Sequence, residues 1–106
     1  MSPPKQFIVK VQTTVIGTVA FAVWDSDMGV ASGVFRPTYA YRPFDHATQI
    51  DGILIERSQD LKVTWPDGDL LSCDAVGLID HSTCAGDEGR EVTAFGVRDD
   101  AFWKVR

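Results

Sequence analysis

The sequence of 106 residues lacks long hydrophobic runs and clustered basic residues, and it contains only two cysteines. No apolar stretch approaches the ~20 residues that a transmembrane helix requires. Two cysteines, Cys73 and Cys84, are too few for a disulfide-stabilised fold, and we expect both to be reduced thiols. The ten Lys and Arg residues are scattered, whereas a protein that binds a nucleic acid backbone needs them clustered. We therefore expect contact with neither membrane nor nucleic acid.

Sequence signatures of metal and phosphate sites are also missing. Cys73, His81 and Cys84 are suitable zinc ligands by type, but the chain has no Cys-x-x-Cys pair and no fourth ligand at a recognisable spacing. The only closely spaced glycines in a polar loop, Gly86 and Gly89, enclose two carboxylates that would repel a phosphate. We expect no cofactor and no metal site.

The composition is that of an ordinary globular protein. Hydrophobic residues make up 44% and charged residues 24% of the chain, and the formal net charge is -5. These fractions argue against disorder. A chain of this length most simply folds as one domain, residues 1–106, with the polar and proline-containing residues 1–6 as a loose lead-in.

The strongest local signal is a β-hairpin over residues 61–73. Its turn contains Pro66, which presets the first corner, Asp67, which can bond the backbone ahead, and Gly68, which can adopt a left-handed conformation. The turn predicts a register in which Trp65 faces Asp69, Val63 faces Leu71 and Leu61 faces Cys73. The side chains of Leu61, Val63, Leu71 and Cys73 would then share a buried face.

Alternating apolar residues predict several more strands. The longest, Val15 to Trp24, is apolar on both faces, so we expect it to be central and covered on both sides. The phase of alternation slips near Asp74, which indicates a bulge or a break between two strands. The expected fold is mainly β, with α+β possible: a small antiparallel, barrel-like or curved sheet of about five or six strands, drawn from residues 7–12, 15–24, 30–35, 61–78 and 91–97.

Helix is expected in only two places. Residues 43–52 would hold one short helix that ends at Gly52, and Asp99 would cap a final helical turn whose apolar residues are Phe102 and Trp103. The prolines of residues 36–44 exclude a central strand and indicate a loop. The acidic residues 80–89, with their two glycines, are expected to form an exposed loop.

The leading functional hypothesis is a non-catalytic protein-binding module, such as an inhibitor, an immunity-type protein or a small subunit of an assembly. Arginine and tyrosine are enriched in the residues that contribute most to protein–protein binding. The loop of residues 36–44 is rich in both, and a second, acidic rim would suit a basic protein partner. The candidate partner-binding residues are Arg36, Tyr39, Tyr41, Arg42, Phe44, Asp87, Glu88 and Glu91. The competing interpretation of the loop is a lid whose aromatic side chains pack onto the sheet.

Two alternatives belong to other classes. One is a small enzyme or metal-dependent domain that uses His81, Cys84 and Asp80, although no catalytic motif surrounds them. The other is a structural component that self-associates through an edge strand. The residues from Lys10 to Ala22 imitate a secretion signal, but their polar and β-branched residues suit a strand better. We therefore expect the protein to act in the cytoplasm.

Overall fold

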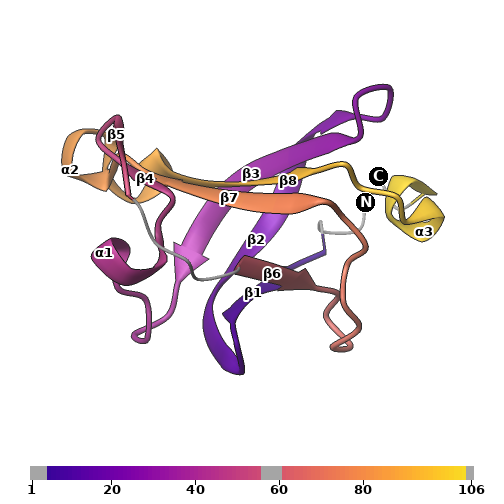
Figure 1. The fold of residues 1–106 in the computed structure, drawn as a ribbon, viewed down its shortest axis with the longest axis horizontal. Coiled ribbons are helices and arrows are strands. Elements are labelled where there is room, and N and C mark those ends of the chain that lie inside the picture. Colours follow the sequence, from indigo (N-terminus) through magenta and orange to yellow (C-terminus); the bar gives the residue numbers. More distant parts are fainter. Residues whose placement is uncertain (1–4, 56–60, 105–106) are drawn as a thin grey trace.

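The computed structural model describes residues 5–55 and 61–104 and contains eight strands (Figure 1). The strands are β1 (Phe7–Val11), β2 (Thr14–Asp25), β3 (Val30–Pro37), β4 (Gln49–Ile50), β5 (Ile53–Leu54), β6 (Leu61–Thr64), β7 (Ala75–Asp80) and β8 (Arg90–Phe95). The helical segments are α1 (Pro43–His46), α2 (Ser82–Ala85), η1 (Gly86–Gly89, a 3-10 turn) and α3 (Asp100–Lys104). None of the described helices is long and apolar enough to cross a membrane.

All eight strands belong to one sheet, in the order β5-β4-β7-β8-β3-β2-β1-β6. Neighbouring strands are antiparallel except for β4 and β7, which are parallel. The sheet curls into a half-barrel, so the edge strand β6 approaches the start of β7 (Figure 1). The expectation of a mainly β, curved sheet is confirmed, but five or six strands and one helix undercount its elements. Most of the predicted lead-in, residues 1–4, lies outside the described residues.

The hairpin of residues 61–73 has the predicted register near its turn. The backbone N–H of Trp65 donates to Asp69 at 2.7 Å, and that of Leu71 donates to Val63 at 2.9 Å. Gly68 has the positive φ, 102°, that the turn requires. Val63 and Leu71 are buried. Of the two expectations for the phase slip near Asp74, the structure has the break: β7 starts anew at Ala75.

Two bulges in β2 change which of its side chains are buried. In the pairing of β2 with β1, consecutive residues of β1 lie opposite Gly17 and Val15, so Ile16 is an extra residue. In the pairing of β2 with β3, consecutive residues of β3 lie opposite Phe21 and Val23, so Ala22 is another. Each extra residue reverses the alternation that follows it. Ile16 is therefore buried and Val23 is exposed. The expectation that both faces of this strand are covered is wrong for its second half.

The predicted helix of residues 43–52 is wrong beyond its first turn. α1 ends at His46, and Thr48 then pairs with Leu78 of β7. The backbone N–H of Thr48 donates to the carbonyl of Leu78 at 2.7 Å, and the Thr48 hydroxyl accepts the Leu78 N–H at 3.1 Å. Asp51 and Gly52 both have positive φ, 49° and 84°, which is the two-residue turn of a β-hairpin. Gly52 is thus a hairpin residue between β4 and β5, and the pairing with β7 outweighs the helical tendency.

The expected loop of residues 80–89 is also more ordered than predicted. Asp80 ends β7 and is buried, and the residues after it form the two helical turns α2 and η1. The η1 residues Asp87 and Glu88 are exposed, as an acidic loop would leave them.

An aromatic cluster fills the end of the half-barrel next to α3. Phe102 of α3 is fully buried, and its ring centroid lies 5.5 Å from that of Phe7 on β1, 5.4 Å from Phe21 on β2 and 4.4 Å from Trp24. Asp99 accepts the backbone N–H of Ala101 at 3.1 Å, as expected for a cap of this helix. The final turn therefore closes one end of the core, as predicted.

Candidate functional site

The loop between β3 and α1 is held against the sheet by Thr38. Its backbone N–H donates to the carbonyl of Ile16 at 2.8 Å, and its hydroxyl donates to the carbonyl of Val15 at 3.0 Å. A turn follows, in which the N–H of Tyr41 donates to the carbonyl of Thr38 at 3.1 Å. This anchoring fixes the direction of the side chains that come after it.

Tyr41 points inward and packs onto the sheet, as the interpretation of this loop as a lid expects. Its hydroxyl donates to Oδ2 of Asp80 at 2.6 Å, and its ring packs edge-on against Phe35 at 5.1 Å between centroids. Burial, together with the hydrogen bond to Asp80, raises the pKa of the Tyr41 hydroxyl far above its ordinary value. Tyr41 is therefore a neutral donor that joins the loop to β7.

Asp80 collects the polar contacts beneath this loop. Oδ1 accepts the backbone N–H of Ser82 at 2.8 Å, and Oδ2 lies 3.5 Å from Nε of Arg90, which also lies 3.5 Å from Asp87 through Nη1. Burial on its own raises the pKa of the Asp80 carboxyl, but the hydrogen bonds from Ser82 and Tyr41 and the charge of Arg90 outweigh it and hold the pKa below its ordinary value. A charged Asp80 thus ties the loop, α2 and β8 together.

The other candidate residues of the loop face solvent. Tyr39 is 100% exposed and Phe44, on α1, is 66% exposed. Arg36 and Arg42 are also exposed, and neither forms an ion pair within the described residues. Of the five candidate residues in this segment, the structure leaves four available to a partner.

The acidic rim lies at the same end of the sheet as the loop. Glu91 of β8 pairs with Val34 of β3, and continuing this register by two residues places Arg36 beside Gly89, the last residue of η1. Asp87 and Glu88 belong to that same turn. The two candidate sets are therefore neighbours, joined by Tyr41, Asp80 and Arg90.

An exposed apolar hairpin, not predicted from the sequence, lies at this end. Ile53 and Leu54 of β5 are 67% and 66% exposed, and β4 and β5 lie near α1 and α2 at the left of Figure 1. The signal was present in the Asp51-Gly52 pair, a strong indicator of a tight hairpin. Interpreting Gly52 as the end of a helix concealed it.

The residues of the enzyme alternative are only partly brought together. Nδ1 of His81 lies 4.0 Å from Oδ1 of Asp51, and the same oxygen accepts the hydroxyl of Thr83 at 2.7 Å. Cys84 is exposed, whereas Asp80 is buried beneath Tyr41. Within residues 5–55 and 61–104, no three His, Cys, Asp or Glu side chains are placed to hold a metal ion.

The structure is a small, curled β domain. Exposed apolar and charged side chains lie together around α1 at one end of its sheet. Searches against protein-family models, curated proteins and solved structures find no match to the chain.

Proposed function

We propose that the protein is a non-catalytic protein-binding module of the cytoplasm, acting as an inhibitor, an immunity-type protein or a small subunit of an assembly. Its contact surface is the α1 end of the sheet, defined by Tyr39, Phe44, Ile53 and Leu54 together with the neighbouring Arg36 and Arg42. The observation that carries the proposal is the exposure of these four large apolar side chains, by 66% to 100%, on or beside α1 and β5 at one end of the molecule. Large exposed apolar groups rimmed by polar residues are typical of protein interaction sites.

Hydrogen bonds hold the residues beneath this surface in place. Tyr41 and Asp80 lock the loop, and β4 pairs with β7 below the hairpin. A preformed surface loses little conformational entropy when a partner binds. The acidic residues Asp87, Glu88 and Glu91 beside it would speed the approach of a basic partner.

Two matched double variants test the proposal. Phe44→Ser with Ile53→Ser removes two apolar contacts from the surface, whereas Val23→Ser with Met28→Ser removes two of similar exposure, 65% and 71%, elsewhere on the molecule. Surface changes of this kind alter stability by about 0.5 kcal/mol or less, so both variants should stay folded. In quantitative co-purification from the native host, the first variant should capture at least about tenfold less partner than the wild type. The second variant should capture as much partner as the wild type.

Retention of the partner by both variants would refute the proposal. A native mass that shows a dimer, and a monomer for the Phe44→Ser, Ile53→Ser variant, would instead establish the self-associating alternative.

A further inference from the structure

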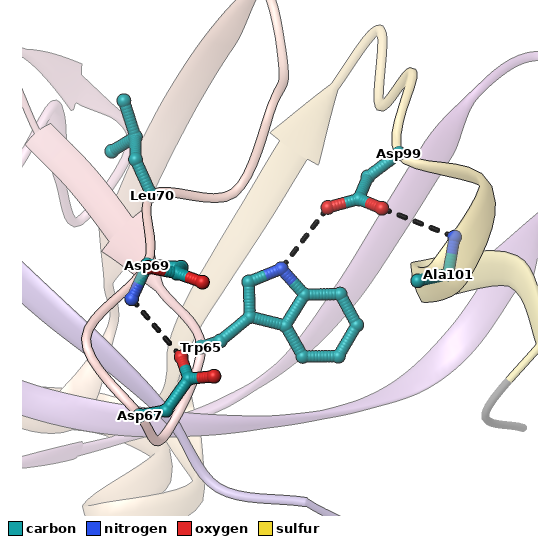
Figure 2. Close-up of a pocket in the computed structure, with 6 residues that line it drawn as sticks. All are labelled: Trp65, Asp67, Asp69, Leu70, Asp99 and Ala101. Atoms are coloured by element: carbon teal, nitrogen blue, oxygen red, sulfur yellow. Dashed lines mark hydrogen bonds between the residues drawn. The ribbon is translucent and has the colours of Figure 1, made fainter.

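A second candidate surface lies at the opposite end of the molecule. An open hollow of about 610 Å³ lies between the turn after β6 and the start of α3 (Figures 1 and 2). Its lining residues are Trp65, Asp67, Asp69, Leu70, Asp99 and Ala101. From the sequence, this turn was predicted only as part of a hairpin.

The walls of the hollow are fixed by hydrogen bonds and packing. The indole N–H of Trp65 donates to Oδ2 of Asp99 at 3.0 Å, and the N–H of Asp69 donates to Oδ1 of Asp67 at 3.0 Å, as Figure 2 shows. The Trp65 ring also packs against Phe7 at 4.9 Å between centroids. The Trp65 ring and the carboxylates of Asp67 and Asp99 are therefore held in place before any ligand arrives.

The charged side chains that line the hollow are all carboxylates. Three carboxylates surround a single indole, and within residues 5–55 and 61–104 no Lys, Arg or His forms an ion pair with Asp67, Asp69 or Asp99. A bare metal ion is a poor match, because the described residues contain no set of three metal ligands. A cation with an apolar stem fits better, since the exposed side chain of Leu70 offers that stem a surface.

A cation of the chain itself already lies near this indole. The ammonium of Lys5, which does not line the hollow, lies 5.6 Å from the centroid of the Trp65 ring. That separation is within the range of a cation–π contact, and tryptophan is the aromatic side chain that favours such contacts most. Carboxylates beside the ring add charge-assisted hydrogen bonds for a guanidinium or an ammonium.

We infer that this hollow binds an arginine or lysine side chain of a protein partner. The cation faces the Trp65 ring and the carboxylates of Asp67 and Asp69, and its aliphatic stem lies along Leu70. This contact is separate from the α1 surface, so the protein has two recognition sites, one at each end of the half-barrel.

The test follows the indole N–H signals of the 15N-labelled protein by NMR during titration with the capped peptide Gly-Arg-Gly. The neutral control peptide carries citrulline, which has nearly the shape of arginine without its charge. Trp65 should shift and saturate with the arginine or the matching lysine peptide and stay unmoved with citrulline. Trp24 and Trp103, whose indoles donate to the carbonyls of Phe21 and Val97, are internal controls.

Two double variants make the test specific. Asp67→Asn with Asp69→Asn keeps an acceptor for the turn but removes two charges, and should weaken binding at least about fivefold. Asp25→Asn with Asp27→Asn removes two charges from the β2–β3 turn, where Asp25 likewise accepts a backbone N–H, and should bind normally. So should the Phe44→Ser, Ile53→Ser variant, which separates this result from that of the proposed function.

Three results would overturn the inference: an unmoved Trp65 at millimolar arginine and lysine peptide, equal shifts with the citrulline peptide, or equal weakening by the two charge variants.

Discussion

Two tyrosines in one loop, Tyr39 and Tyr41, have opposite surroundings. Tyr39 is fully exposed, whereas Tyr41 donates its hydroxyl to the buried carboxylate of Asp80. Their separation in the sequence is two residues, and no local pattern distinguishes them, because the partner of Tyr41 lies 39 residues further along the chain. The difference is set by the anchoring of Thr38 and by the position of β7.

At the residue scale, we predict that Tyr41→Phe lowers the free energy of unfolding by about 1.5–3 kcal/mol. The change leaves the ring in place but removes one hydrogen-bond donor from the buried, charged carboxylate of Asp80. Tyr39→Phe, the matched control, should alter stability by about 0.5 kcal/mol or less. Urea unfolding of the two variants beside the wild type measures both values, and equal effects would show that the Tyr41–Asp80 hydrogen bond does not stabilise the fold.

At the scale of elements, α1 depends on a histidine for its first turn. The backbone N–H of Arg42 donates to Nδ1 of His46 at 3.0 Å, so this nitrogen must be unprotonated. Burial, with a smaller effect from the charge of Arg42, holds the pKa of His46 below its ordinary value of 6.5, although Asp45 acts in the opposite direction. α1 therefore couples its stability to pH.

We predict that the wild type loses stability as the pH falls from about 7 to 5. The unfolded imidazole takes up a proton near its ordinary pKa, whereas the folded one resists protonation, so acid favours the unfolded state. His46→Asn supplies a neutral acceptor for the Arg42 N–H and should reduce this pH dependence. Urea unfolding across the pH range measures the slope, and identical slopes in the two proteins would rule out His46 as its source.

The elements that could be predicted from the sequence are those specified by neighbouring residues. Pro66, Asp67 and Gly68 were enough for the register of one hairpin, and alternation was enough for β1, β3 and β8. The two bulges of β2 could not be predicted, because an extra residue is defined only against the partner strand. The same is true of β4, whose extended conformation depends on pairing with β7.

The candidate site shows the same division. Residue type alone was enough to select the Arg- and Tyr-containing loop and the acidic rim, but not to show that they are neighbours. Their proximity arises from the pairing of β3 with β8, which brings together residues far apart in the chain. The hollow beside Trp65 depends on Asp99, the residue just before α3, whose carboxylate accepts the Trp65 indole N–H. The sequence predicted Asp99 as a helix cap but did not indicate that it would meet this indole.

At the scale of the whole molecule, Phe102 closes the half-barrel. We predict that Phe102→Ala lowers the free energy of unfolding by about 3–5 kcal/mol, because it opens a cavity among the aromatic side chains. Such a loss is a large part of the 5–15 kcal/mol typical of native proteins. Phe44→Ala, at an exposed phenylalanine, is the matched control and should have little effect. Denaturation with near-ultraviolet circular dichroism tests this, and a loss below about 1 kcal/mol would show that α3 packs loosely.

The position of Phe102 in the chain also affects how the protein is made. The ribosome synthesises Phe7, Phe21, Trp24 and Trp65 well before the side chain that covers them. Until α3 has left the exit tunnel, the nascent chain carries an uncovered aromatic surface, and such surfaces aggregate or recruit chaperones. Folding during translation therefore cannot finish before the last described helix emerges.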